Sequence, residues 1–314
     1  MNNFEQKLSL AKDNFCGIDN AVERKRAIAN YLFPEEDIDI ALSKMEYRID
    51  NKRDLDLDNP KDISSKLHWL KINFRENHLG EYVDKYKARE IVKSKIGEKY
   101  LPNCYWVGHD LSSVNREVLP KKFVLKANHS WDKNIFCLDK DIFNWDKARN
   151  ESLEWLQDNH YLMHGEWAYS QIKKPLLIIE ELLEVDGKIP DDFKIYCFNG
   201  EPKLVKYDSG RDNIRMQMHL DTNWNPLPFH NPNYEEFTHP ILKPKNFDEM
   251  LSVAKELSRG FPFLRVDLYN IKGSVYFGEF TLYPCGGNLR FVPDEWNYFV
   301  GDLLDLKKFF LSKR

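Results

Sequence analysis

Residues 264–268 read LRVDL and residues 276–281 read YFGEFT, and a short turn joins these two runs. Both runs are rich in β-branched and aromatic residues, so they predict a pair of antiparallel strands. Gly273 can supply the positive φ of a three-residue hairpin loop. With such a loop, Arg265 would lie opposite Glu279, so the hairpin would bring an arginine and a carboxylate together from adjacent strands.

This hairpin would have one apolar face and one charged face. Side chains alternate along a strand, so Leu264, Val266 and Phe280 would share the apolar face. The other face would carry Arg265, Asp267, Glu279 and Thr281. Two carboxylates can hold a hard divalent cation, and an arginine can stabilise a transferring phosphoryl group. An exposed hairpin with surface salt bridges is the alternative, and the hairpin taken alone favours that alternative.

The composition is that of an ordinary globular protein. The chain has 314 residues, 42% of them hydrophobic and 31% charged, which suggests two domains or one large α/β unit. A net charge of -4 argues against a nucleic acid as the main partner. The five cysteines are scattered and form no CxxC pair, which fits reduced thiols. We expect no secretory signal, no transmembrane segment and a cytoplasmic location.

The chain begins with helical patterns and continues with short strands. Periodic apolar residues predict helices at 21–32 and 38–49, and the pattern stays helical from 64 to 96. The best-marked helix covers 247–259, with a capping residue before it and a glycine after it. Short strands are expected at residues 105–107, 120–126, 134–138 and 175–180.

The strongest turn signal is Asn199-Gly200, the dipeptide best suited to a type I′ hairpin. It lies between residues 193–198 and 201–207, which both read as strands. The stretch from 207 to 245 is rich in Asn, Pro and His and predicts a long excursion. Loops of this length often face a substrate or move.

Three further groups suit nucleotide binding, although each also has an ordinary structural explanation. Lys126 ends an apolar strand before a polar turn and could meet phosphate oxygens, but a lone lysine there is usually solvated. Residues 180–183 read EELL after a buried strand, where backbone groups could read an adenine edge. Asp192 and Lys194 suit ribose hydroxyls and phosphates, but cross-strand ion pairing explains them equally well.

Taken in order, residues 66–301 resemble the ATP-grasp superfamily, and in particular its TupA-like branch, which is often found with bacterial surface-polysaccharide genes. The most specific part is the hairpin, where residues 265–267 (RVD) and 279–284 (EFTLYP) are similar to the superfamily's arginine, two metal acids and following proline. The third metal position is usually Asn and is Thr281 here. Residues 193–200 are similar to a run typical of the TupA-like branch.

The resemblance implies roles for individual residues. The implied catalytic residues are Arg265 and Lys126. The implied ATP-binding residues are Lys85, Lys126, Glu180, Glu181, Leu182, Leu183, Asp192 and Lys194, and the implied Mg²⁺ ligands are Asp267, Glu279 and Thr281. Relatives carry a glycine-rich clamp where residues 128–132 read NHSWD, which leaves open whether this loop closes over the phosphates.

The implied fold is α+β: an ATP-grasp fold in which two α+β subdomains with antiparallel sheets clamp ATP after a helical N-terminal segment. The expected boundaries are 1–62 for the helical segment, 63–118 for the N-terminal part of the ATP-grasp unit, 119–182 for the nucleotide clamp and 183–314 for the C-terminal subdomain with the metal site.

The implied activity is that of an ADP-forming carboxylate–amine ligase that works through an acyl phosphate. It would join an amino acid or amine to a uronic acid or sugar of a capsule or O-antigen precursor, in the bacterial cytoplasm and near the inner membrane. A glycosyltransferase of surface-polysaccharide synthesis and a non-catalytic nucleotide-binding module are the alternatives. Arg211, Arg215 and Arg290 are candidates for binding substrate carboxylates, because arginine binds them through two hydrogen bonds.

Overall fold

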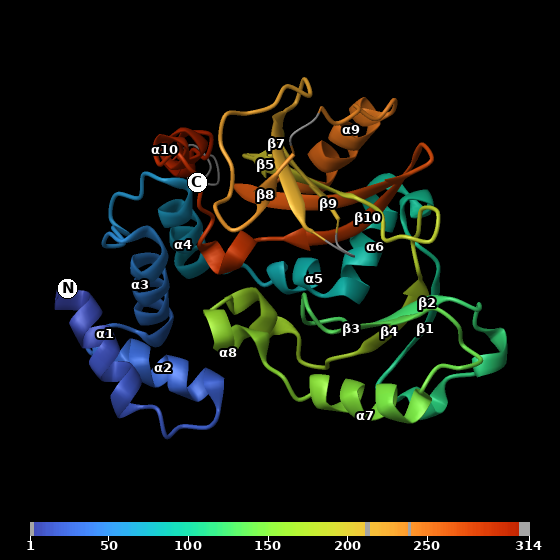
Figure 1. The fold of residues 1–314 in the computed structure, drawn as a ribbon, viewed down its shortest axis with the longest axis horizontal. Coiled ribbons are helices and arrows are strands. Elements are labelled where there is room, and N and C mark those ends of the chain that lie inside the picture. The colour runs from blue at the N-terminus through green and yellow to red at the C-terminus, as the bar shows by residue number, and fades with distance from the viewer. Residues whose placement is uncertain (1–2, 211–213, 238–239, 308–314) are drawn as a thin grey trace.

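The computed structural model describes residues 3–210, 214–237 and 240–307, and it contains two β-sheets flanked by helices (Figure 1). The α-helices are α1 (Asn3–Asn14), α2 (Ala21–Leu32), α3 (Ile38–Asn51), α4 (Ile63–Asn73), α5 (Leu79–Val83), α6 (Lys85–Ile96), α7 (Trp145–Trp155), α8 (His160–His164), α9 (Phe247–Ser258) and α10 (Glu295–Asp302). Short 3-10 helices include η4 (Trp167–Gln171) and η5 (Pro284–Gly287).

The strands form a four-stranded and a six-stranded sheet. The strands are β1 (Cys104–Gly108), β2 (Phe123–Ala127), β3 (Asn134–Cys137), β4 (Leu177–Glu181), β5 (Asp192–Phe198), β6 (Glu201–Ser209), β7 (Met216–Asp221), β8 (Glu235–Glu236), β9 (Phe263–Ile271) and β10 (Ser274–Thr281). The smaller sheet has the order β1-β4-β2-β3 and is antiparallel. The larger has the order β10-β9-β5-β6-β7-β8, and only its β7–β8 pair is parallel.

Each sheet has its own hydrophobic core. Helix α7 packs its Ala148 and Trp155 against the apolar side of the four-stranded sheet. Helices α4, α5, α6 and α9 share a core with the apolar side of the six-stranded sheet. The polar side of the larger sheet is therefore left for other contacts.

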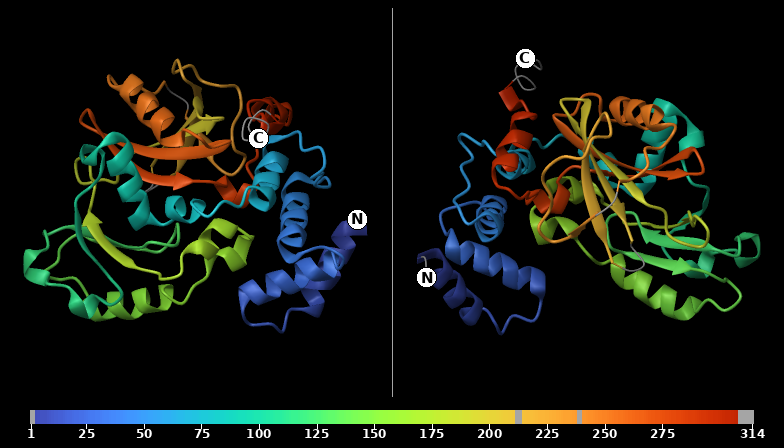
Figure 2. Two further views of the ribbon diagram at one scale, coloured as in Figure 1. Left: turned by 180° about the vertical axis from the view of Figure 1, so that it is seen from behind. Right: turned by 45° about the horizontal axis from the view of Figure 1, so that its top comes forward.

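The N-terminal helices form a third unit beside the two sheets. Helices α1, α2 and α3 share a small core around Ala29, Leu42 and Met45. The further views place these helices at one side of the molecule, next to α8 and α4 (Figure 2). Arg75 on the α4 side donates to Asp39 of α3 over 2.7 Å, and Arg26 of α2 donates to the Leu162 carbonyl of α8 over 3.2 Å.

The expected elements are present with small shifts. Helix α9 ends at Ser258, one residue before its expected end, and its apolar stripe is buried. The Asn199-Gly200 hairpin has φ of 51° and 80°, as a type I′ turn requires. The expected helical stretch at 64–96 is divided into α4, α5 and α6. Asp84 begins the last of these because its carboxylate accepts from the backbone N–H groups of Tyr86 and Lys87.

The predicted register of the β9–β10 hairpin was wrong. Lys272 and Gly273 both have positive φ, 52° and 89°, and form a two-residue turn instead of a three-residue loop. The register then shifts between Phe277 and Glu279. As a result Glu279 lies opposite Asp267, and Thr281 lies opposite Arg265. The face predicted to be charged is unchanged, because the turn and the bulge together restore the alternation.

Within the residues that the structure describes, no helix is both long enough and apolar enough to cross a membrane.

Candidate active site

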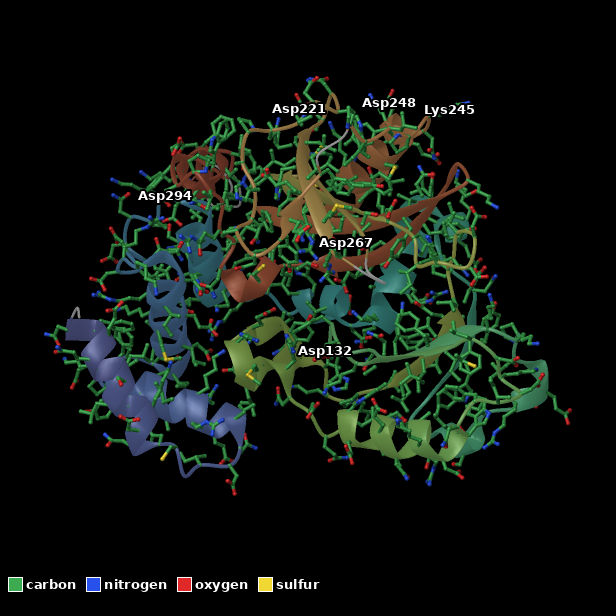
Figure 3. All side chains as sticks on the ribbon, viewed as in Figure 1. Asp132, Asp221, Lys245, Asp248, Asp267 and Asp294 are labelled. Atoms are coloured by element: carbon green, nitrogen blue, oxygen red, sulfur yellow. The ribbon has the colours of Figure 1, made fainter. Side chains whose placement is uncertain are left out.

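The polar side of the six-stranded sheet gathers four charged residues at its β5–β9–β10 end. Asp267 on β9 lies between Lys194 on β5 and Glu279 on β10 in the strand register, and Arg265 precedes it by two residues on the same face. Figure 3 shows Asp267 in the interior of the molecule, whereas the labelled Asp248 lies at its edge. The three strands therefore bring two carboxylates and two cations together at one site.

Asp267 is held as a carboxylate by two buried cations. Arg265 donates to both of its oxygens over 2.7 Å, and the Lys194 ammonium donates to Oδ2 over 2.9 Å. Burial alone would raise the Asp267 pKa, but Arg265 and Lys194 keep that pKa well below its ordinary value. The group is therefore an anion at neutral pH and can serve as a metal ligand.

Glu279 is the more open of the two carboxylates. Its side chain is 31% exposed, and its Oε2 accepts from the Lys85 ammonium over 2.9 Å. Arg265 Nη2 lies 3.7 Å from Oε1. Burial acts to raise the Glu279 pKa, and the charges of Lys85, Lys194 and Arg265 outweigh it, so the pKa is lowered. Helix α6 thus places the Lys85 ammonium against Glu279 of the β9–β10 hairpin.

The donor set fits a magnesium ion that arrives with a nucleotide. Within the described residues, no three acidic, histidine or cysteine side chains group to form a metal site. Mg²⁺ is usually held by one or two carboxylates together with phosphate and water oxygens. Asp267 and Glu279 supply two carboxylates, and Thr281 extends the same face one position further, opposite Arg265. The residues would hold Mg²⁺ jointly with the phosphates.

A cleft between the two sheets brings the expected nucleotide residues together. The cleft has a volume of about 910 Å³ when the open space at its mouth is included. The expected residues that line it are Lys85, Lys126, Glu180, Glu181, Leu182, Leu183, Asp192, Lys194, Asp267 and Glu279. The cleft is also lined by residues that the sequence analysis did not select, namely Trp131, Lys133, Phe136, Tyr269 and Phe277.

Lys126 and Glu180 face each other on the neighbouring strands β2 and β4. The two side chains form an ion pair, and Arg89 of α6 lies 3.4 Å from the other oxygen of the same carboxylate. Both lysines expected to bind phosphate, Lys85 and Lys126, therefore have a carboxylate partner in this structure. A phosphate group would take the place of those carboxylates as their partner.

The loop at residues 128–132 is tied to its surroundings. Asn128 accepts from the Leu176 backbone N–H over 2.7 Å through its side chain, and its carbonyl accepts from the Lys85 N–H over 2.9 Å. The His129 ring lies 3.0 Å from the Trp155 carbonyl of α7. Trp131 is 62% exposed at the tip. This loop is anchored at its base and projects a large apolar side chain at the cleft.

Helix α4 holds the turn that follows the β9–β10 hairpin. Ser64 donates to the Gly287 carbonyl over 2.8 Å, and the His68 ring lies 2.9 Å from Asn288 Oδ1. Lys71, fully buried, donates to the Gly286 carbonyl over 2.9 Å. Residues 64, 68 and 71 share one helix face, so α4 fastens the turn at three successive points.

Lys71 also connects this turn to the N-terminal helices. Its ammonium donates to the His164 carbonyl of α8 over 2.9 Å and to Glu46 of α3 over 3.4 Å. Burial acts to raise the Glu46 pKa, but Lys71, His164 and Lys25 together lower it. Lys71 is thus a buried junction between α3, α8 and the turn that follows the β9–β10 hairpin.

Of the three expected substrate arginines, the two that the structure describes do not line the cleft. Arg211 lies outside the described residues. Arg215 is exposed and lies over the Tyr234 ring, 5.7 Å from its centre. Arg290 is exposed and acts electrostatically on Asp50. Their assignment to a substrate stays a prediction.

Sequence reasoning missed the polar residues that continue the site across β6 and β7. Lys206 lies opposite Lys194, and Asp208 lies opposite both Asp192 on β5 and Gln217 on β7. The signal was present as an alternation: residues 204–208 read LVKYD and residues 216–220 read MQMHL, with polar side chains at every second position.

A family model described as TupA-like ATP-grasp matches residues 65–305, which is most of the chain. A search of the curated proteins found no match.

Solved structures with a similar fold include three from Bacillus species. An L-amino acid ligase from Bacillus licheniformis is 14% identical with a TM-score of 0.45, over 80% of this chain and 57% of that one. A D-alanine–D-alanine ligase from Bacillus anthracis is 13% identical with a TM-score of 0.44, over 81% and 72%. Its complex with ATP is 14% identical with a TM-score of 0.40, over 70% and 55%. The chain thus spans little more than half the length of two of these structures.

Proposed function

The chain belongs to the TupA-like ATP-grasp family, and we propose that it is an ADP-forming carboxylate–amine ligase whose active site is the cleft between the two sheets. The ATP-grasp fold expected from the sequence is confirmed by the family match. The observation that carries the proposal is the convergence of Asp267, Glu279, Arg265, Lys194 and Lys85 on one wall of that cleft.

The residues that line the cleft have different tasks in the proposed reaction. Lys85, Lys126 and Lys194 bind the phosphate oxygens and balance their charge. Asp267 and Glu279 hold Mg²⁺, which when bound neutralises the triphosphate. Glu181, Leu182 and Leu183, at the end of β4, provide backbone groups and apolar contact for adenine, and Asp192 accepts from the ribose hydroxyls. These side chains position the γ-phosphate for attack by a substrate carboxylate.

Arg265 has the catalytic task. Its guanidinium is buried and already oriented by two hydrogen bonds to Asp267, so it is fixed before the substrate arrives. Nη2 lies only 3.7 Å from Glu279 without a hydrogen bond to it, at the point where both carboxylates face the cleft. A fixed cation at this place stabilises the negative charge of an acyl phosphate and of the tetrahedral species formed when an amine attacks it.

For substrates, we propose a uronic acid or sugar of a bacterial surface-glycan precursor and an amino acid or amine. The support is the membership of the TupA-like family and the polar residues beside Arg265. The carboxylate attacks the γ-phosphate and releases ADP. The amine then displaces phosphate, loses a proton and forms the amide.

The test is release of ADP and phosphate from ATP and Mg²⁺. A panel of uronic acids and nucleotide-linked sugars is combined with a panel of amino acids, and each pair is compared with its single members. Release that needs both members of a pair supports the ligase. ATP that binds without turnover with every pair contradicts it and favours a nucleotide-binding module, and release of a nucleotide from the sugar donor favours a glycosyltransferase.

A further inference from the structure

The polar face of the large sheet extends well beyond the residues assigned to nucleotide and metal. Strand β5 carries Asp192, Lys194 and Tyr196 on this face, because alternate residues of a strand point the same way. The register continues the face onto β6 at Lys206 and Asp208. From there it reaches β7 at Gln217 and His219.

Four of these side chains, Tyr196, Asp208, Gln217 and His219, are buried and carry polar atoms that make no hydrogen bond to a described residue. Tyr196 and Asp208 are each 1% exposed and Gln217 is 3% exposed. The Tyr196 hydroxyl, both oxygens of Asp208 and both amide atoms of Gln217 make no hydrogen bond to any residue the structure describes. Leaving such an atom unsatisfied is unfavourable, and native proteins carry few of them. The five such atoms of Tyr196, Asp208 and Gln217 in one patch indicate a partner that is not part of this chain.

The charges around the patch are already balanced. Lys206 Nζ lies 3.4 Å from Asp208 Oδ2, and Lys194 Nζ lies 3.9 Å from the same oxygen. The Tyr234 ring covers the Lys206 ammonium, with its centre 5.6 Å away. At the other border, exposed Cys285 is near enough to act electrostatically on both Tyr196 and Lys206. The patch therefore lies between Arg265 and the exposed residue Cys285.

We propose that Tyr196, Asp208 and Gln217 form a subsite for the hydroxyl groups of a saccharide, next to the reacting carboxylate at Arg265. This subsite rests on the proposed ligase function and specifies which part of its substrate the sheet recognises. A hydroxyl both donates and accepts, so a pair of adjacent hydroxyls can satisfy the Asp208 carboxylate and the Gln217 amide together. These two side chains lie directly opposite each other on β6 and β7.

An ammonium group fits this place less well than a hydroxyl. Asp208 is already within 4 Å of two lysine ammonium groups, so a third cation would meet repulsion from both of them. Gln217 offers a donor as well as an acceptor, and an ammonium could use only the acceptor. The chemistry of the patch therefore favours the sugar part of a substrate over the amine.

The first test is thermal unfolding of two variants that each remove one buried amide. Gln217→Met keeps the length of the side chain and removes an amide without partners. Asn297→Leu removes an amide that is 1% exposed and fully engaged, with the Phe291 N–H at 2.8 Å and the Phe291 carbonyl at 2.9 Å. We expect Asn297→Leu to lower the melting temperature by several degrees and Gln217→Met not to lower it. An equal loss in both variants would overturn the subsite, because Gln217 would then have structural partners such as bound water.

The second test is calorimetric titration in the presence of Mg²⁺ and a non-hydrolysable ATP analogue. The probes are D-glucuronate, D-galacturonate and D-mannuronate, with succinate as an acid without hydroxyls and L-glutamate as an acid with an ammonium. We expect at least one sugar acid to bind more tightly than both controls. Gln217→Met should weaken that binding about tenfold, the effect of losing one or two hydrogen bonds, and should leave succinate unchanged.

The outcomes separate this subsite from the function on which it rests. Sugar acids that bind no better than succinate, or that bind equally to Gln217→Met, overturn the subsite even if ATP is turned over. Sugar acids whose binding depends on Gln217, in a protein that never forms ADP with any acid and amine, support the subsite and contradict the ligase.

Discussion

The two ends of the polar sheet face treat buried charge in opposite ways. At the β5–β9–β10 end, which we call the paired end, Arg265 and Lys194 satisfy Asp267, and Lys85 satisfies Glu279. At the β6–β7 end, which we call the open end, Asp208 and Gln217 are as deeply buried but their polar atoms make no hydrogen bonds to the described residues. Both ends lie on one face of the same sheet and Asp267 is as buried as Asp208, so the difference is in the partners.

This difference indicates two kinds of binding. At the paired end a ligand must replace a partner that is already present. Binding there therefore depends on charge, and the number of hydrogen bonds and ion pairs changes little. At the open end a ligand adds hydrogen bonds to Asp208 and Gln217 without breaking a hydrogen bond to a described residue. Catalytic groups need fixed positions before the substrate binds, and the paired end provides them. A site that selects the substrate can form its hydrogen bonds when the ligand binds.

Asp267→Asn should give the largest effect, because it removes a charge from the centre of the paired end. We expect turnover of the productive substrate pair to fall at least about 1,000-fold, since one of two metal carboxylates is lost. Asp248→Asn is the matched control, because its side chain is 94% exposed (Figure 3). Steady-state ADP release measures both. Near-normal turnover in Asp267→Asn would show that the paired end does not hold the metal.

Lys71→Met tests whether the paired end depends on the junction that fastens its turn. Removing this buried cation leaves Glu46 short of a partner and two carbonyls unsatisfied, so we expect about 3 kcal/mol of destabilisation. Alkylation of Cys285, which lies in the turn, should become faster relative to Cys104, since both thiols are exposed. Peptide mapping by mass spectrometry measures the ratio. An unchanged ratio would mean that α4 does not position the turn.

Lys126→Met tests the exchange of partners expected at the four-stranded sheet. The lysine is paired with Glu180 in this structure, and binding of ATP would transfer it to a phosphate. We expect the dissociation constant of Mg-ATP to rise about 10- to 30-fold, which corresponds to the loss of one charge-assisted hydrogen bond. Lys122→Met, which removes a lysine paired with Glu184 outside the cleft, is the control. Equal affinity in the Lys126 variant and in this control would remove Lys126 from the site.

Lys206 gives the smallest expected effect, and it concerns the open end. Burial lowers its pKa to about 8, and Asp208 only partly offsets this. The ordinary pKa of lysine is near 10.5, so between these values the unfolded chain binds more protons than the folded one and stability rises with pH. From pH 8 to pH 9 this residue should add about 1 kcal/mol to the free energy of unfolding. Lys206→Met should lack that rise in denaturant unfolding, and an identical rise in the variant would exclude Lys206 as its source.

The sequence predicted which hairpin residues of the paired end share a face, because that pattern is local. Residues 264–281 form one hairpin, and alternation alone selects Arg265, Asp267 and Glu279 for one face. The predicted register was wrong because the turn has two residues instead of three and because a bulge near Gly278 leaves no separate signal in the sequence. The open end was missed because Asp208 and Gln217 gain their meaning only when β6 pairs with β7 and the burial of each atom is known.

Other parts stay predictions for a physical reason. Resemblance assigned Lys85 and Lys126 to the nucleotide, and the cleft does bring them together, but their occupancy depends on a ligand that exchanges with Glu279 and Glu180. The substrate arginines were chosen by residue type alone. Arg215 and Arg290 lie at the surface, where side-chain charge gives no information about distance from the cleft.

The most direct test of the account is calorimetric titration of the wild-type protein with a non-hydrolysable ATP analogue, once with Mg²⁺ and once with EDTA. The paired end predicts binding that is at least about tenfold tighter with Mg²⁺, because Asp267 and Glu279 hold the metal only together with phosphates. Equal affinity in the two titrations, or no binding in either, would contradict the assignment of this cleft as a Mg-ATP site.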